Sequence, residues 1–177
     1  MNFTRWTAVA ILAAMLHLHA QTSAPTQSPA PAAAPTMDQT VAFINGIFNG
    51  TGSFSSQGGS EVLSQRVTVD SSCILLYQET WRIEGESPLG KGIAQVYLGK
   101  ANPMSLQVAH IEDTWHITVE QPGSHSHYDQ NHKLNPSYID PKPEIGEFPN
   151  SEAAQKVAKA YIHAMVLCHK PEAPSPF

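Results

Sequence analysis

The chain has 177 residues, of which 41% are hydrophobic and 14% charged, and its formal net charge at pH 7 is −5. This length fits one ordinary folded domain with additional terminal segments. Its basic residues are scattered rather than clustered, which argues against nucleic acid and anionic membrane surfaces as partners.

Residues 1–20 are predicted to be a secretory signal peptide. Arg5 provides a basic start, an apolar stretch runs to Leu16, and Ala20 is the expected cleavage position. The apolar stretch is shorter than the roughly 20 residues that a membrane-spanning helix needs. We therefore expect an exported protein, periplasmic or secreted, without a membrane span after cleavage. An uncleaved, membrane-tethered form is the alternative.

Two segments are not expected to contribute to a folded core. Residues 21–35 consist of Ala, Pro, Ser, Thr and Gln without a charge, which is typical of a disordered spacer. Residues 171–177 are rich in proline and are expected to form a loose tail. Residues 36–170 between them are predicted to fold as a single globular domain.

A short amphipathic helix is predicted at the start of this domain. Thr36 and Gln39 are spaced as a capping box, in which each side chain binds the backbone N–H of the other residue. Apolar residues then recur at helical spacing on one face as far as Phe48. Asn49-Gly50 is a natural stop, so we expect the helix to end there.

Antiparallel strands are predicted for the middle of the domain. Segment 73–84 has the strongest pattern, because Leu75, Tyr77 and Trp81 share the parity that should face a core. The other expected strands are 61–70, 92–99, 105–111 and 114–120, after a weak candidate at 53–57.

The last of these strands leads into a region without a clear pattern. In segment 114–120, Trp115 and Ile117 are expected to point into the core and His116 to point out. Residues 121–149 are rich in Pro, Asn, Asp, His and Ser and offer little to bury. We expect a long loop there, and such loops are usually functional or disordered.

The closing helix, beginning at Asn150 or Ser151, is the clearest element of the sequence. Glu152 suits the positive end of its dipole, and Pro171 prevents its continuation. Its buried stripe is expected to consist of Ala154, Val157, Ala158, Tyr161, Met165 and Cys168.

The two cysteines are predicted to form a disulfide. Cys73 has the inward parity of the strongest strand, and Cys168 lies on the inward stripe of the closing helix. In an exported domain two such residues should meet and oxidise. Closing a loop of this length contributes up to about 4–5 kcal/mol in the chain-entropy model. The alternative is two separate buried thiols that pack as small apolar side chains.

Three histidines in the expected loop are weak candidates for a metal site. His125 and His127 are two residues apart, and His132 and Asp129 are close by in sequence. Imidazoles in this arrangement could ligate zinc or copper. The alternative is a solvated polar loop, because such spacing arises easily in polar segments.

No residue is assigned a catalytic or cofactor-binding role. No serine lies in a nucleophile-elbow pattern, and no glycine-rich stretch has phosphate-loop spacing. Several carboxylates are scattered along the chain, and nothing in the sequence selects two of them for acid–base chemistry. These residues are Glu79, Glu84, Glu86, Glu112, Asp113 and Glu120.

Parts of the chain resemble a family of uncharacterised exported bacterial proteins. The closing helix has the pattern Val-Ala-Lys-Ala…His-Ala…Leu-Cys, from Val157 to Cys168. The segment 40–45 is similar to the opening helix of that family, and Cys73 matches its other cysteine. The resemblance implies two helices around antiparallel strands with a structural disulfide, an order similar to that of pleckstrin-homology-like barrels.

The sequence as a whole predicts an α+β domain. About five to seven antiparallel strands would form a curved sheet or partly closed barrel, with a short N-terminal helix and the closing helix packed on it. We expect a non-enzymatic binding or interaction module for a protein, peptide or small apolar ligand. The alternatives are a metal-binding protein that uses the histidine loop and a cryptic hydrolase.

Overall fold

The computed structural model describes residues 33–56, 59–83, 90–121, 124–128 and 139–169. The predicted signal peptide, most of the predicted spacer and the predicted tail lie outside these ranges. No helix among the described residues is long and apolar enough to cross a membrane.

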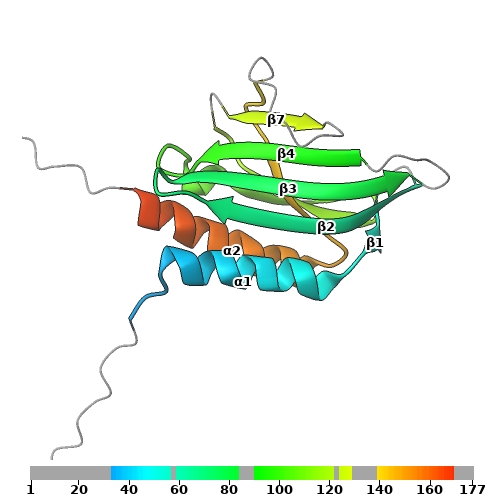
Figure 1. Cartoon of the computed structure of the whole chain (residues 1–177), viewed down its shortest axis with the longest axis horizontal. Helices are drawn as coiled ribbons and strands as arrows, with labels where there is room; N and C mark the ends of the chain where they lie inside the picture. The colour runs from blue at the N-terminus through cyan, green and yellow to red at the C-terminus, as the bar shows by residue number, and fades with distance from the viewer. Residues whose placement is uncertain (1–32, 57–58, 84–89, 122–123, 129–138, 170–177) are drawn as a thin grey trace, which may run out of the picture. The chain divides into compact units, whose positions relative to one another are not determined.

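Along the chain, one helix precedes all the strands and another follows them (Figure 1). The elements are α1 (Met37–Thr51), β1 (Phe54–Ser55), β2 (Ser60–Val69), β3 (Ile74–Ile83), β4 (Gly90–Tyr97), the 3-10 helix η2 (Pro103–Ser105), β5 (Gln107–Ile111), β6 (Thr114–Thr118), β7 (His125–Tyr128), β8 (Glu144–Phe148) and α2 (Ser151–Cys168). The expected α+β class is confirmed.

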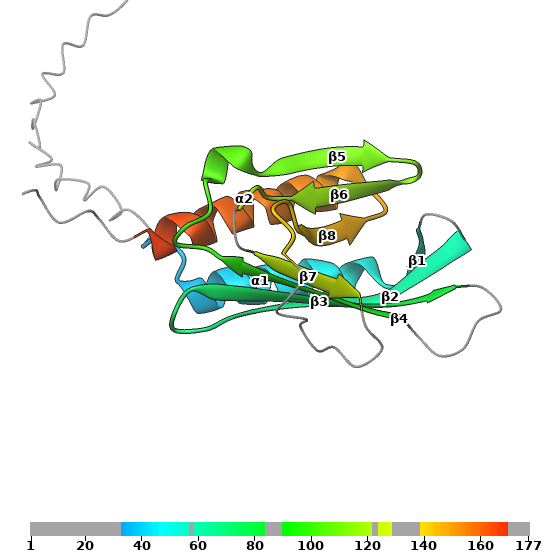
Figure 2. The ribbon, with the colours of Figure 1, turned by 90° about the horizontal axis from the view of Figure 1, so that it is seen from above.

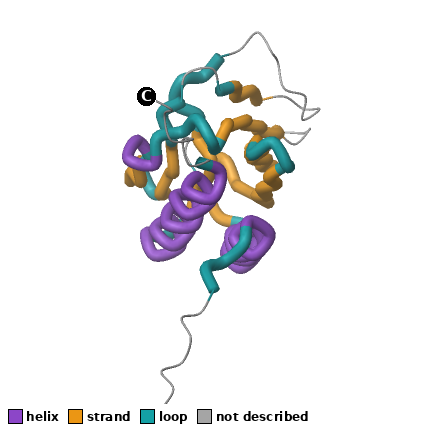
Figure 3. Tube along the Cα trace, turned by 90° about the vertical axis from the view of Figure 1, so that its left-hand side faces the viewer, coloured by secondary structure: helices purple, strands orange, loops and turns teal. Residues whose placement is uncertain are grey.

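The strands form two antiparallel sheets (Figure 2). Sheet A has five strands in the order β1-β2-β3-β4-β7, and sheet B has three in the order β5-β6-β8. The sheets are not closed into a barrel. The two helices lie side by side (Figure 3), with α1 against β2 of sheet A and α2 against sheet B.

Helix α1 forms as the capping box predicts. The Gln39 N–H donates to Thr36 Oγ1 at 3.3 Å, and the Thr36 N–H donates to Gln39 Oε1 at 2.8 Å. Ile44 and Phe48 are buried on its inner face. The helix runs slightly beyond the expected stop, to Thr51, because Gly52 supplies the positive φ of 63° that turns the chain away.

Helix α2 is capped by Asn150, whose side chain accepts a hydrogen bond from the Ala153 N–H at 2.9 Å. Every residue of the predicted stripe is buried, which confirms the helical pattern. The Tyr161 hydroxyl donates to the Ile145 carbonyl at 2.6 Å, so the helix is joined to β8 by a buried hydrogen bond as well as by packing.

The predicted disulfide between Cys73 and Cys168 is present, with the two Cα atoms 5.8 Å apart. The two residues are separated by 95 positions in the sequence. The bridge joins the last residue of α2 to the turn that precedes β3. It therefore fixes the end of the closing helix to sheet A, while the body of the helix packs on sheet B.

The expectation of a long loop over 121–149 is wrong for two of its described segments, which form strands. Strand β7 pairs with β4, and strand β8 pairs with β6. Gln121 is buried and holds the start of this region, since its side chain accepts from the Tyr97 N–H at 2.7 Å and donates to the Tyr97 carbonyl at 2.6 Å. Both strands were missed because their stability comes from partners distant in sequence.

The prediction that His116 points to solvent is also wrong, because its exposed fraction is 5%. The alternation along β6 is as expected, with Ile117 fully buried under α2. The opposite face of sheet B is not solvated, however, because it faces sheet A. Both faces of β6 are therefore buried, and alternation alone could not indicate this.

Candidate functional site

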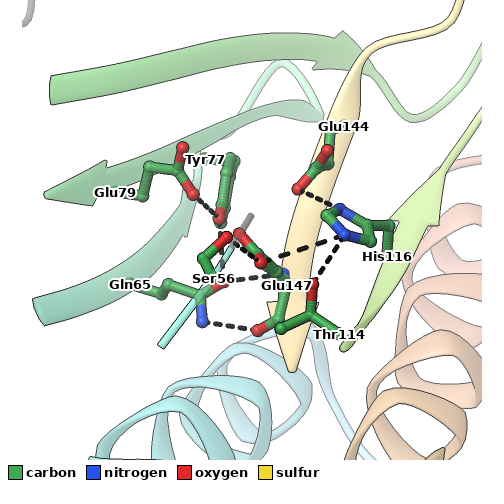
Figure 4. A network of polar contacts seen from close by, with 8 residues as sticks. All are labelled: Ser56, Gln65, Tyr77, Glu79, Thr114, His116, Glu144 and Glu147. Atoms are coloured by element: carbon green, nitrogen blue, oxygen red, sulfur yellow. Dashed lines mark hydrogen bonds and ion pairs between the residues drawn. The ribbon is translucent and has the colours of Figure 1, made fainter. Parts of the chain in front are cut away.

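Polar side chains gather between the two sheets (Figure 4). Sheet A and the segment after β1 supply one side of this group, and strands β6 and β8 supply the other. We call it the inter-sheet cluster. It consists of Ser56, Gln65, Tyr77, Glu79, Thr114, His116, Glu144 and Glu147.

A bulge in β8 places two of its carboxylates on one face. Glu144 and Glu147 are three residues apart, and in a regular strand they would point to opposite faces. The pairing with β6 shifts register here, so that His116 lies opposite Glu147 and Thr118 lies opposite Glu144. The extra residue of the bulge turns both carboxylates toward His116.

Gly146 permits this local geometry. A Cβ atom at this position would lie 2.9 Å from Cε2 of the Phe148 ring, closer than side-chain packing allows. The Phe148 ring stacks on the Phe48 ring of α1, with ring centres 5.4 Å apart. The glycine therefore lets β8 bulge while its last residue remains packed against the N-terminal helix.

A second bulge, in β2, brings Gln65 into the cluster. The register with β3 shifts between Val62 and Ser64, and both Val62 and Gln65 are buried. The Gln65 side chain donates to the Glu147 carbonyl at 2.6 Å and accepts from the Glu147 N–H at 2.9 Å. The Gln65 amide thus forms the same two hydrogen bonds with β8, an edge strand of sheet B, that a neighbouring strand would form. These bonds link sheet A to sheet B.

His116 lies between the two carboxylates of β8. Its Nδ1 is 3.0 Å from Glu144 Oε1, and its Nε2 is 3.8 Å from Glu147 Oε1 and 2.9 Å from the Thr114 hydroxyl. The side chains of His116 and Glu147 are 6% and 7% exposed, whereas that of Glu144 is 25% exposed. The Ser56 hydroxyl also donates to Glu147 Oε1. Glu144 is therefore the member nearest to solvent.

Tyr77 connects the cluster to a third carboxylate. Its hydroxyl oxygen is 2.8 Å from Gln65 Oε1 and 2.7 Å from Glu79 Oε2. A hydroxyl has one proton to donate, so both contacts are hydrogen bonds only when Glu79 is protonated and donates to Tyr77. Tyr77 then donates to Gln65. This arrangement favours the neutral form of Glu79.

Burial raises the pKa of Glu79 to about 7, and the nearby carboxylates of Glu144 and Glu147 act in the same direction. The hydrogen bond with Tyr77 and the charge of His116 lower this pKa, but burial outweighs them. Burial also raises the pKa of Glu144. Burial by itself would lower the pKa of His116, but its hydrogen bond to Glu144 and the surrounding carboxylates outweigh burial and raise it. Protons therefore bind this cluster near neutral pH.

The cluster includes a set of three groups that could bind a metal ion. His116, Glu144 and Glu147 each offer a ligand atom, and these atoms lie within 4.8 Å of one another. Imidazole and carboxylate together form the ligand sets of many divalent first-row cations. The same groups could also exchange protons with a bound molecule.

The residues proposed from sequence for metal binding are elsewhere or undescribed. His125 and His127 lie on β7, opposite Gln95 and Ile93 of β4. The positions of their side chains, and all of His132, lie outside what the structure describes. That site stays a prediction.

Sequence reasoning missed the residues that the fold brings together. One signal was present, because Glu79 shares the inward parity of Leu75 and Tyr77 on β3. A carboxylate at a core position calls for a partner, and this could have indicated a buried polar site. His116, Glu144 and Glu147 gave no comparable signal, since their placement depends on the bulge in β8 and on the cover from sheet A.

Comparison with protein-family models, with curated proteins and with solved structures found no match to this chain.

Proposed function

We propose that this protein is a non-enzymatic binding module that holds a divalent cation between its two sheets. The ligands are His116, Glu144 and Glu147. The observation that carries the proposal is the approach of their three ligand atoms to within 4.8 Å of one another, at a place where two strands and a bulge determine their positions.

The ligand atoms must move closer together to hold a small cation, because they spread over distances of up to 4.8 Å. A tetrahedral zinc ion with bonds of about 2.0–2.1 Å holds its ligand atoms roughly 3.3 Å apart. His116 can bind one ion through only one of its ring nitrogens. Glu144 faces Nδ1 at 3.0 Å and Glu147 faces Nε2 at 3.8 Å, so one glutamate side chain must rotate toward the nitrogen that holds the ion. Three protein ligands leave a coordination position for water or for a further ligand, and Glu144 lies on the side that solvent can reach.

Charge also supports a cation at this position. When His116 is neutral and both glutamates are ionised, the three ligands carry two negative charges in a largely buried site, which is unfavourable without a compensating cation. The raised pKa values of His116 and Glu144 mean that protons compete for the site. Cation binding should therefore release protons and strengthen as the pH rises.

The experiment is a calorimetric titration of the chelator-treated full mature chain with zinc chloride, followed by manganese and magnesium chloride. We expect one zinc ion per chain, weaker binding of magnesium, and a proton release that appears when buffers of different ionisation enthalpy are compared. His116→Ala and Glu147→Gln should each weaken zinc binding at least about tenfold.

Two control variants make the result specific. His163→Ala removes an imidazole from the outer side of α2 and should leave zinc binding unchanged. A His125→Ala/His127→Ala variant tests the site that the sequence indicated. Loss of binding in that variant, with unchanged binding in His116→Ala, would transfer the function to β7, and the absence of zinc binding in the wild-type chain would refute the proposal.

We also propose that the protein is bacterial and acts after export, in the periplasm or outside the cell. Support comes from the signal-like segment 1–20, from a disulfide that an oxidising compartment favours, and from the resemblance of both helices to an exported family. Fractionation of producing cells and the mass of the mature chain test this. A mature chain that begins at Gln21 is the expected result, and an intact reduced precursor in the cytoplasm contradicts it.

Acid–base catalysis is a second candidate, favoured by one specific observation. The pKa of Glu79, about 7, is suited to a group that both accepts and donates a proton near neutral pH. A hydrolase of this kind would lose its activity in Glu79→Gln, which should leave zinc binding intact because Glu79 is not among the three ligands. A panel of chromogenic esters and glycosides, assayed with both proteins, separates the two candidates.

A further inference from the structure

A solvent-open groove lies between the outer surfaces of α1 and α2, away from the inter-sheet cluster. It has a volume of about 350 Å³, and its lining is almost entirely apolar. Pro35, Phe43 and Ala160 contribute to this lining. The volume is at the lower end of the range of ligand pockets, about 300–1,000 Å³, which indicates a small occupant.

Phe43 is the most distinctive residue of this groove. Its exposed fraction is 51%, although it lies on a helix whose inner positions Ile44 and Phe48 are buried. A large aromatic side chain beside an apolar hollow provides a surface that water solvates poorly. A hydrocarbon chain bound in the groove would remove the Phe43 ring and its own apolar surface from water.

Three basic residues contribute mainly the apolar parts of their side chains to the other side of the groove, so their charged ends lie at its border. Lys156, Lys159 and His163 line it along one face of α2, at spacings of three and four residues. Lys156 forms an ion pair with Glu152 at 2.6 Å, so Lys159 and His163 are the basic residues of the groove that can meet an anion. His163 Nε2 is 2.9 Å from the Pro35 carbonyl, which holds the ring at the border of the groove.

We propose that this groove binds an alkyl carboxylate, a free fatty acid of medium chain length. The tail lies across Phe43 and Ala160, and the carboxylate lies beside Lys159 and His163. Charge complementarity selects an anion, and the apolar lining selects a hydrocarbon rather than a sugar or nucleotide.

A peptide fits the groove less well than an alkyl chain. The groove is formed by the sides of two helices, whose backbone N–H and C=O groups are already bonded within each helix. An extended peptide would find no backbone partners there, and its amides would be buried without hydrogen bonds. An alkyl chain has no such requirement.

The experiment uses the full mature chain and sodium decanoate below its micelle-forming concentration, measured by calorimetry. We expect binding of one decanoate per chain. Between octanoate and decanoate the affinity should rise roughly fourfold for each added CH₂ group that becomes buried. Methyl decanoate, which has no charge, should bind about two- to fivefold more weakly than decanoate.

Exposed residues provide variants that should not disturb folding. Phe43→Ser should weaken decanoate binding about tenfold, because it removes most of the apolar contact. Lys159→Gln should weaken it about two- to fivefold. The matched controls are Val166→Ser, an apolar position of α2 that is 58% exposed and outside the groove lining, and Lys142→Gln, an exposed lysine near β8. Both should bind decanoate as the wild type does.

Three results would overturn the proposal. One is the absence of decanoate binding, and the second is unchanged binding in Phe43→Ser. The third is that the wild-type chain does not bind decanoate but binds an acidic peptide or anionic phosphatidylglycerol vesicles, and that this binding is lost in Lys159→Gln. That result would assign the groove to the peptide or to the membrane surface. Zinc binding is measured separately on the same variants and is independent of all three results.

Discussion

The two faces of sheet B are both buried, but they are buried in different ways. Toward α2 the sheet presents Ile117 and Ile145, which are fully enclosed by the apolar stripe of the helix. Toward sheet A it presents His116 and Glu147, which are almost as well buried but lie among hydrogen-bonding groups. Adjacent residues of one strand thus belong to an apolar core and to a polar cluster.

This difference separates stability from function in the fold. The apolar face contributes the burial that holds the domain together, at about 25 cal/mol for each Å² removed from water. The polar face contributes much less, because burying charged groups costs nearly as much as their interactions return. A polar cluster that does not improve stability is therefore the better candidate for a functional site.

The largest expected effect concerns the disulfide, which fixes α2 over the apolar face. Replacing both residues, in Cys73→Ser/Cys168→Ser, should lower the free energy of unfolding by up to about 4–5 kcal/mol. Denaturant titration monitored by circular dichroism measures this change. A loss below about 1 kcal/mol would show that packing alone holds the helix.

Neighbouring residues of β6 provide the sharpest test of the comparison. Ile117→Ala should lower the free energy of unfolding by about 2–5 kcal/mol at any pH, because it creates a cavity in the apolar face. His116→Ala should lower it by about 3 kcal/mol at low pH, because it leaves buried carboxylates without their partner.

The pH dependence of the His116→Ala effect follows from the raised pKa of His116. The folded state binds this proton more tightly than the unfolded state, so the stabilisation is fully present below pH 6.5 and is lost as the pH rises through the folded-state pKa. Denaturation curves at pH 5.5 and 8.5 measure it. Equal pH profiles for His116→Ala and Ile117→Ala would contradict the distinction between the two faces.

Glu79→Gln should stabilise the protein at alkaline pH. The pKa of Glu79 is raised from 4.5 to about 7, so the wild-type stability falls as the pH rises between these values. A glutamine at position 79 is uncharged, as the protonated acid is, so the stability of the variant should not decrease over this pH range. The variant should exceed the wild type by up to about 3 kcal/mol above pH 7 and match it below pH 4.5.

Melting temperatures from pH 4 to pH 9 would test this prediction. Glu120→Gln, at an exposed position near the end of β6, is the matched control and should show no such crossover. If Glu79→Gln lowered stability at every pH, the carboxylate would be ionised in the folded protein.

The smallest effects are expected at two buried tyrosines. Tyr161→Phe removes one hydrogen bond, to the Ile145 carbonyl, and should lower the free energy of unfolding by about 1 kcal/mol at any pH. Tyr77→Phe removes the hydroxyl that joins Glu79 to Gln65, so its effect of about 1–2 kcal/mol should change as Glu79 titrates near pH 7. Parallel pH profiles of the two variants would argue against a protonated Glu79.

The helices and the disulfide could be predicted from sequence because their signals are local. The capping box at Thr36, the cap at Asn150 and the apolar stripes depend on residues within a few positions of one another. The bond between Cys73 and Cys168 was predicted from the inward parity of each residue, although Cys73 lies in the turn just before β3 rather than on the strand. The expected antiparallel strands from 61 to 120 were recognisable by alternation for the same reason.

The candidate site could be predicted only in small part. Glu79 lies at a position where the alternation of β3 indicates a core residue, and its burial follows from that pattern. The positions of His116, Glu144 and Glu147 in the site depend on two features of the fold that cannot be recognised from neighbouring residues in the sequence. One is the bulge that turns both glutamates to the same face of β8, and the other is the cover that sheet A provides for sheet B.

By itself the sequence determined where α1 and α2 begin, which of their faces is buried and which sulfurs meet, because these follow from periodicity and capping over short distances. Only the tertiary structure decided that a second sheet exists, that β8 completes it and that His116 and three glutamates gather between the layers. The physical reason is that a strand is stabilised by its neighbours, and the pairing of β8 with β6 joins residues far apart in the chain.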